Sequence, residues 1–220
     1  SGFYKPDAGR RLLGGQTLPV GAAWRSARSG IARTYQTSLL FGSLSVLDNV
    51  ALALPRGRLG ALLGRQAVAS PAAQAQASAL LRWCGYLGDV HLPAAGLAHV
   101  DRRLVEIARA LATDPDQLLL DEPAAGLSRQ DKQQLAALLR RVADAGLGVL
   151  VVEHDMALVM DISDHVVVID AGKPLAEGVP AAVQQDAAVR RAYLGEPGAL
   201  QATRRAGGVA EDARELLGVG

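Results

Sequence analysis

One stretch decides the fold of this chain: Gln117-Leu118-Leu119-Leu120-Asp121-Glu122-Pro123-Ala124-Ala125-Gly126. Three consecutive leucines are typical of a strand buried on both faces, as in a parallel sheet. Two carboxylates follow at once, and Pro123 cannot continue the hydrogen-bond ladder of a strand. Ionised carboxylates at the end of a buried strand are costly to desolvate unless a partner binds them. A hydrated Mg²⁺ that carries phosphates is a suitable partner, because Mg²⁺ takes carboxylate oxygens and keeps several of its waters.

Taken alone, this stretch is equally consistent with a buried strand that ends in an acidic turn. Two further predicted strands also end in polar residues, one over Ile31–Gln36 and one over Val149–Val152, which Glu153-His154-Asp155 follows. Although a lone histidine at a strand end is more often structural than catalytic, ligands of parallel sheets lie at the carboxyl ends of the strands. One crevice could therefore gather the polar residues at these ends: Gln36, Asp121, Glu122 and His154.

The composition limits the class of protein. The chain has 220 residues, of which 50% are hydrophobic, enough for one large domain with a sub-domain. Lys and Arg number 23 against 22 Asp and Glu, so the charge indicates neither nucleic acid nor an anionic membrane as a partner. The single cysteine, Cys84, excludes an intramolecular disulfide, and the longest apolar stretch, Leu147–Val152, is too short to span a bilayer.

Strands alternate with helices along the chain, which predicts an α/β doubly wound sheet. No strand pattern occurs over 56–96, so a helical sub-domain, about 50–113, is expected between the glutamine strand and the acidic strand. Its helices include 73–83 and one that Asp101 caps and that ends at Leu111. Later in the chain, a helix is expected from the Ser128 cap to about Ala145, another helix over 157–162, a strand over 165–169 and a turn over 170–173. Two further helices are expected, one from Pro180 and one over 187–194. The polar linker over 196–220 is expected to contain a helix at about 209–217.

The loop over 37–45 contains three apolar residues, Leu39, Leu40 and Phe41, beside the polar end of a strand. Such a loop is either a lid on the core or a surface that docks a partner. The pattern of residues leaves both interpretations open.

In their order and spacing, these segments resemble the ATP-binding subunit of an ABC transporter. The similar motifs are the Q-loop (Arg33-Thr34-Tyr35-Gln36, then Val46–Val50), the helix after the signature motif (Glu106–Leu111), Walker B (Leu118–Pro123), the D-loop (Ala124–Ser128) and the switch-histidine segment (Val152–Met156). Asp-Glu-Pro-Ala-Ala-Gly-Leu and Ala192-Tyr193-Leu194-Gly195 are similar to the importers of branched-chain amino acids. The resemblance covers nearly all of residues 1–195.

The resemblance implies ATP and Mg²⁺ as cofactors. Asp121 would hold Mg²⁺ through water, and Gln36 would contact Mg²⁺ and the attacking water. Glu122 would orient and deprotonate that water, and His154 would contact the γ-phosphate. The implied partners are transmembrane permease subunits, which dock near Leu39–Phe41, and a second ATP-binding subunit in a homo- or heterodimer. The implied location is peripheral, at the cytoplasmic face of the inner membrane.

Two features depart from the family pattern. The sequence contains no Gly-x-x-x-x-Gly-Lys-Ser/Thr, so residues 1–195 are expected to form an incomplete P-loop-NTPase-like sheet that lacks its first strands and the P-loop. The segment that would contact ATP across the dimer also differs from Leu-Ser-Gly-Gly-Gln: it reads Leu97-Ala98-His99-Val100-Asp101. Ala98 lacks the serine hydroxyl, Val100 adds a side chain where glycine lets the backbone approach phosphate, and Asp101 adds negative charge.

These observations favour the ATPase subunit of an importer for branched-chain or related amino acids, of which this chain would be an inactive C-terminal portion. One alternative is a non-enzymatic module that docks on a permease complex. Another is a non-transport ABC ATPase that acts on DNA or ribosomes. The near-neutral charge and the Tyr193-Leu194-Gly195 segment argue against the last.

The chain as printed is expected neither to bind Mg·ATP tightly nor to hydrolyse it. Positioning of the reacting groups can account for ~7–11 kcal/mol of a barrier, and the expected phosphate cradle is not in this sequence. Calorimetric titration and phosphate release would be compared with a version extended upstream through a P-loop. Micromolar binding by the shorter chain, or turnover that it loses on Glu122→Gln, would contradict this expectation.

Overall fold

The computed structural model describes residues 2, 4–18, 21, 23–37, 39–54 and 70–194. The linker and helix expected over 196–220 lie outside the described residues. The chain divides into two compact units, Ser1–Asp155 and Met156–Gly220.

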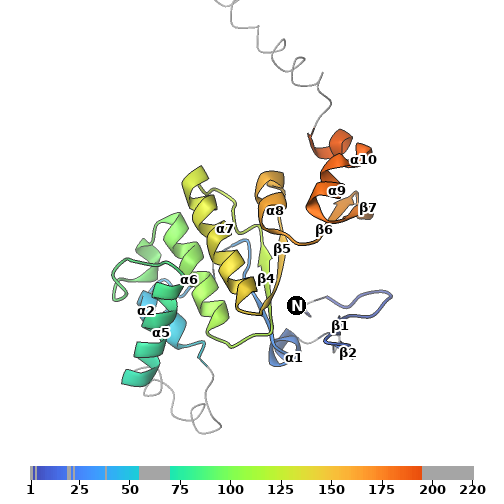
Figure 1. Ribbon diagram of the computed structural model, residues 1–220. Helices are drawn as coiled ribbons and strands as arrows, with labels where there is room; N and C mark the ends of the chain where they lie inside the picture. Colours follow the sequence, from blue (N-terminus) through green and yellow to red (C-terminus); the bar gives the residue numbers. More distant parts are fainter. Residues whose placement is uncertain are drawn as a thin grey trace, which may run out of the picture. The chain divides into compact units, whose positions relative to one another are not determined.

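The first unit is built on a parallel sheet of β3 (Ile31–Arg33), β4 (Gln117–Asp121) and β5 (Gly148–Val152), in that order, with β4 in the middle (Figure 1). Successive side chains of a strand point to opposite faces of the sheet. Leu118 and Leu120 are buried on one face, whereas Leu119 is only partly buried on the other. The expected burial of both faces is therefore only partly met. On β5 it fails at Leu150 and Val152, which are more than half exposed.

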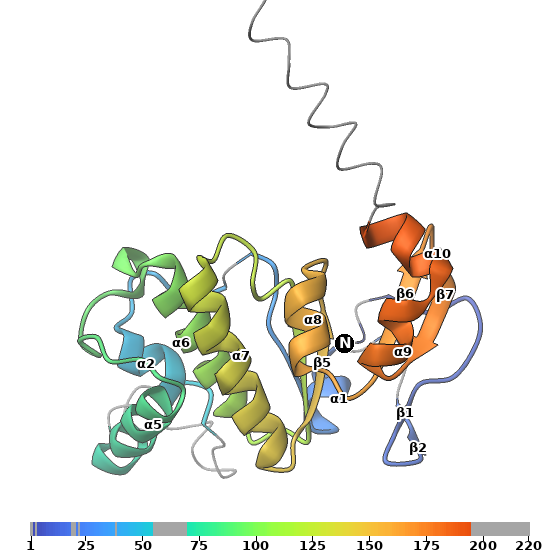
Figure 2. The ribbon, with the colours of Figure 1, turned by 45° about the horizontal axis from the view of Figure 1, so that its top comes forward.

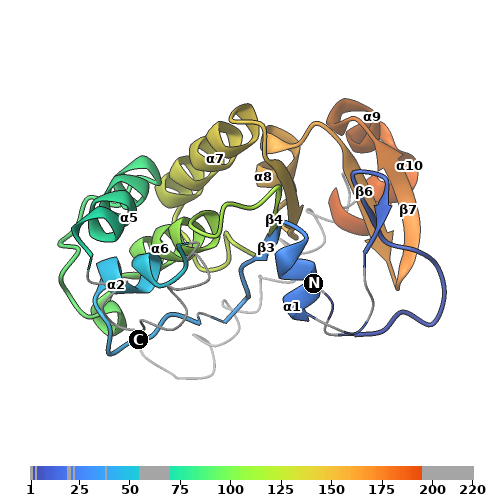
Figure 3. The same ribbon diagram turned by 90° about the horizontal axis from the view of Figure 1, so that it is seen from below.

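Three helices pack on one another beside this sheet: α2 (Val46–Ala51), α5 (Pro71–Trp83) and α6 (His99–Leu111) (Figure 3). Local capping explains where two of them begin. The Ser45 hydroxyl accepts a hydrogen bond from the Asp48 amide, and the Ser70 hydroxyl accepts one from Ala73. The buried side chains between the helices are mostly aliphatic: Val46, Val50, Ala77, Leu81, Leu104 and Ile107.

The expected start of α6 is wrong. Asp101 does not cap the helix, because α6 begins at His99 after Ala98, which makes no side-chain capping bond. The chain enters α6 from a short 3-10 turn, η1 (Ala94–Gly96), and an extended Leu97. Asp101 instead lies in the first turn, where a negative charge is favoured by the helix dipole.

The helix α7 (Arg129–Asp144) follows the acidic turn and packs against β5 (Figure 2). Its start confirms the expected cap: the Ser128 hydroxyl accepts from the Asp131 amide, and the Asp131 carboxylate accepts from Ser128 in return. Its apolar face is buried through Leu135, Leu138, Leu139 and Val142.

Residues near the N-terminus form a small hairpin and a helix. The strands β1 (Leu12–Leu13) and β2 (Gln16–Thr17) pair antiparallel around Gly14 and Gly15, whose positive φ angles allow the tight turn. The helix α1 (Ala23–Arg28) then contacts β3.

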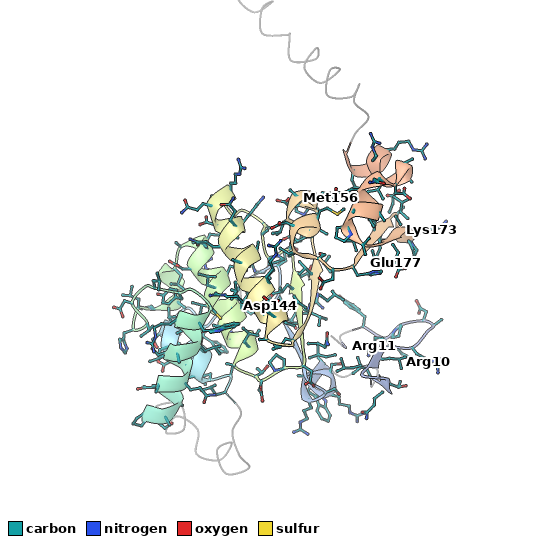
Figure 4. All side chains as sticks on the ribbon, viewed as in Figure 1. Arg10, Arg11, Asp144, Met156, Lys173 and Glu177 are labelled. Atoms are coloured by element: carbon teal, nitrogen blue, oxygen red, sulfur yellow. The ribbon has the colours of Figure 1, made fainter. Side chains whose placement is uncertain are left out.

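The second unit begins with α8 (Met156–Ile162) and continues into an antiparallel hairpin of β6 (Val166–Asp170) and β7 (Lys173–Gly178). The sequence analysis predicted β6 but only a turn after it, because Lys173-Pro174 begins β7 without an apolar alternation. Figure 4 shows Lys173 and Glu177 on β7. The helices α9 (Pro180–Gln185) and α10 (Ala187–Val189), followed by η2 (Arg190–Leu194), complete the unit. Its core contains Val166, Val168, Val183 and Val189.

Cys84 lies at the C-terminal end of α5 and is buried. Burial raises the pKa of its thiol to about 12, and the positive charge of Arg141 opposes this shift. The thiol is therefore protonated at neutral pH.

A buried asparagine on α2 holds the loop that precedes the helix. The Asn49 carbonyl accepts a hydrogen bond from the Phe41 amide at 2.8 Å, and its amide group donates to the carbonyls of Phe41 at 3.0 Å and Ser45 at 2.9 Å. The side chain of Asn49 is fully buried. The side chain therefore supplies the partner of the Phe41 amide and adds a second donor to two carbonyls that also accept the Leu44 and Asn49 amides.

Asn49→Ala is expected to lower the free energy of unfolding by about 2–3 kcal/mol, because it removes three hydrogen bonds of a buried side chain. Urea denaturation of the purified chain would measure this change. The control is Gln76→Ala, an exposed polar residue of α5, which should change the stability by less than about 0.5 kcal/mol. Equal effects of the two substitutions would contradict the interpretation.

Candidate functional site

The structure brings three of the predicted site residues together at the carboxyl edge of the sheet. The Gln36 side-chain amide donates to Glu122 Oε2 at 2.9 Å, and His154 Nδ1 lies 3.7 Å from Glu122 Oε1. These residues follow β3, β4 and β5, respectively. The side chain of Glu122 is 32% exposed, so its carboxylate can reach a ligand in solution.

Asp121 is joined to a residue that the sequence analysis did not assign to the site. Arg33 Nη2 lies 2.8 Å from Asp121 Oδ2, and both side chains are about one third exposed. Arg33 is in register with Leu119, and Asp121 lies two residues further on the same face of β4. The Arg33–Asp121 pair could therefore be predicted only if the register between β3 and β4 were known.

The turn after β4 is fixed to the end of β5 by two hydrogen bonds. The Glu122 amide donates to the Val152 carbonyl at 2.9 Å, and the Ala124 amide donates to Glu153 Oε1 at 2.7 Å. The backbone of Glu122 has a φ of 44°, in the left-handed region that residues other than glycine rarely adopt. Glu153 is therefore a further residue of the site, where it holds the turn through the Ala124 amide.

A polar cavity of about 260 Å³ lies between this turn and the end of β5. Lys132, in the first part of α7, forms an ion pair of 2.6 Å with Asp155 there. The cavity is lined by Ala124, Ala125, Gly126, Lys132, Glu153, His154 and Asp155. Lys132 is not among the site residues predicted from the sequence.

The predicted nucleotide-contacting segment 97–101 lies beside the same turn. His99 Nε2 is 2.8 Å from the Ala125 carbonyl oxygen. Leu97 is buried, Ala98 and His99 are exposed, and Val100 and Asp101 are partly exposed. The exposed residues can meet a ligand, whereas the Leu97 side chain belongs to the core.

The apolar loop forms one wall of a groove rather than a lid on the core. Leu39 and Phe41 are 56% and 50% exposed, and a cavity of about 540 Å³ extends from them to α1, β3 and α6. Arg109 on α6 donates to the Leu39 carbonyl at 2.7 Å and stacks its guanidinium over the Phe41 ring at 5.0 Å. Burial lowers the pKa of Arg109, but a guanidinium remains charged in proteins. The loop is thus held in place with its apolar side chains outward.

The residues at the sheet edge fit a magnesium ion that arrives with phosphates. Asp121 supplies a partly exposed carboxylate and Gln36 an amide oxygen, and Mg²⁺ is usually held by one or two carboxylates together with substrate phosphates. Among the described residues, no group of three or more His, Cys, Asp or Glu is arranged to hold a metal by itself. This donor set is therefore sufficient only when a ligand completes it.

No helix in the described part of the chain is both long enough and apolar enough to cross a bilayer.

Comparison with known proteins shows the family. The ABC transporter model matches residues 1–125, and a model of the branched-chain amino acid ATP-binding cassette transporter matches 173–199. The chain belongs to the ABC transporter family, which confirms the α/β P-loop NTPase fold class.

Within this family, the chain is similar to two curated proteins for branched-chain amino acid transport. It is 38% identical over 203 residues to the high-affinity branched-chain amino acid transport ATP-binding protein LivG of Escherichia coli K12, covering 89% of this chain and 80% of that one. It is 36% identical, with the same coverage, to BraF of Pseudomonas aeruginosa. A solved ATP-binding cassette of an ABC transporter, in its ADP conformation, superposes with a TM-score of 0.75 at 26% identity and covers 89% and 80% of the two chains.

Proposed function

We propose that the chain belongs to the ATP-hydrolysing subunit of an importer for branched-chain or related amino acids, to which it supplies the residues that act on the attacking water. The observation that carries the proposal is the contact of Glu122 with both Gln36 and His154 at the carboxyl edge of the sheet. The names of the similar proteins LivG and BraF support the transported class.

In the proposed reaction, the three side chains act by position and charge. Phosphoryl transfer requires little covalent chemistry from a protein, so orientation and electrostatics dominate. Glu122 orients the attacking water and takes its proton, and the Gln36 amide holds Glu122 and the water in line. His154 contacts the γ-phosphate, and Asp121 with Gln36 would hold Mg²⁺, which neutralises phosphate charge when bound.

The groove beside Leu39 and Phe41 is the proposed docking surface for a transmembrane permease subunit. Large exposed apolar side chains that are clustered mark interfaces more often than free surface. The segment 97–101 is the proposed contact with ATP on a second ATP-binding subunit, in a homo- or heterodimer. Together these contacts would place the protein peripherally at the cytoplasmic face of the inner membrane.

Glu122→Gln is expected to lower Mg·ATP hydrolysis by ~10²–10⁴-fold, because a general base typically contributes this factor. Phosphate release would be measured on the native subunit, purified from its source cell in complex with its permease. Asp144→Asn is the matched control: this exposed carboxylate lies at the far end of α7, and Figure 4 labels it. The control should leave hydrolysis unchanged.

The same measurement separates the proposal from the alternative of a non-enzymatic docking module. If the assembled native subunit supports no ATP hydrolysis, or if Glu122→Gln and Asp144→Asn behave alike, the chain does not hydrolyse ATP through this site. A docking module would still assemble with the permease in that case.

A cysteine at Phe41, introduced by Phe41→Cys, is expected to cross-link to a co-expressed permease subunit. The reason is its exposure at the rim of the groove. Trp83→Cys provides a control, because Trp83 is also an exposed aromatic residue but lies on α5. Cross-linking would be followed by the shift of the permease band on a denaturing gel. Equal yields from both positions, or none from position 41, would exclude this loop as the docking surface.

A further inference from the structure

The side chain of His99 is exposed but forms a hydrogen bond within its own chain. His99 is the first residue of α6, and its Nε2 atom lies 2.8 Å from the Ala125 carbonyl oxygen, 26 positions along the sequence. A carbonyl oxygen can only accept a hydrogen bond, so Nε2 carries the proton in this contact. The bond connects the start of a helix with the turn that follows β4.

The neighbouring Gly126 is packed closely against the same imidazole. A Cβ atom added at Gly126 would lie 3.2 Å from His99 Nε2, a distance tighter than nine in ten real Cβ contacts. The φ of Gly126 is +74°, a conformation that also favours glycine. The close approach of the imidazole and the positive φ thus both favour glycine at position 126.

Other hydrogen bonds hold the turn from within and from β5. The Ala125 amide donates to the Glu122 carbonyl, and the Leu127 amide donates to the Ala124 carbonyl, both at 3.2 Å. The Ala124 amide donates to Glu153 at 2.7 Å. The turn is thus tied to β5 at Ala124 and to α6 at the next residue, Ala125.

We propose that His99 is a positioning residue for this turn and, through it, for the backbone of Glu122. Glu122 has a φ of 44°, and a non-glycine residue keeps such a conformation only where its surroundings hold it. The turn closes onto the Glu122 carbonyl through the Ala125 amide, and the His99 bond holds the carbonyl of the same residue, Ala125. The inference stands on contacts within the chain and does not depend on nucleotide binding.

The test uses amide hydrogen exchange of the chain in four forms: wild type, His99→Phe, His99→Asn and His99→Gln. Glutamine places its amide nitrogen three bonds from Cβ, as far as Nε2 of histidine, whereas the asparagine amide is one bond too short. The reporters are the Ala125 and Leu127 amides, which are both hydrogen-bonded within the turn. Exchange at these amides should be about fivefold faster in the Phe and Asn variants, which corresponds to about 1 kcal/mol for one hydrogen bond. The Gln variant should exchange like wild type.

A second readout is the backbone chemical shift of Glu122, which reports its φ angle. The shift should change in His99→Phe and His99→Asn and return in His99→Gln. A merely structural loss of stability would instead raise exchange throughout the first unit. Amides of α7, which has its own capping box at Ser128, provide the internal standard.

His91→Phe is the matched control, because His91 is an exposed histidine in the loop before α6. It should leave the turn amides and the Glu122 shift unchanged. Three outcomes would each overturn the proposal: unchanged exchange in His99→Phe, equal behaviour of the Asn and Gln variants, or equal acceleration in the turn and in α7. None of these readouts requires ATP, so failure here is separate from failure of the proposed function.

Discussion

The site depends on the parallel pairing of β4 with a neighbour on each side. Parallel strands end at the same edge of a sheet, so each strand presents the residue that follows it to the same space. Gln36, Glu122 and His154 are separated by long stretches of chain, yet they contact one another because their strands are in register. The burial of Leu118 and Leu120 fixes that register, since a slip of one residue would turn both side chains to the other face.

The sequence was most informative where structure is determined locally. The Ser128 cap, the strand β4 and the polar residues at the strand ends all follow from short patterns and are found as expected, although Leu119 of β4 is only partly buried. Contacts across strands could not be predicted in the same way. Arg33 with Asp121, and Glu153 with the Ala124 amide, depend on the relative positions of segments far apart in sequence. The strand β7 was missed because its residues lack the alternation that identifies a strand.

The exposed loop at Leu39 and Phe41 shows why apolar residues alone did not decide between a lid and a docking surface. Their exposure is maintained by polar groups on two helices. Asn49 satisfies the backbone at Phe41, and Arg109 binds the Leu39 carbonyl and covers one face of the Phe41 ring. An interface that is already ordered loses less conformational freedom on binding. Because this loop is ordered before any partner binds, it can serve as a preformed binding surface.

The buried thiol of Cys84 gives the first unit a sensitivity to alkali. The pKa of the thiol is 9.0 in an unfolded chain, whereas burial raises it to about 12 in the folded chain. The folded state therefore binds more protons between these values, so this residue's contribution to stability is complete below about pH 9 and declines as the pH rises further. Since the thiolate is the nucleophile, electrophilic reagents at neutral pH would modify Cys84 mainly in molecules whose α5 terminus has opened. The extent of Cys84 modification would thus report how often the C-terminal end of α5 opens.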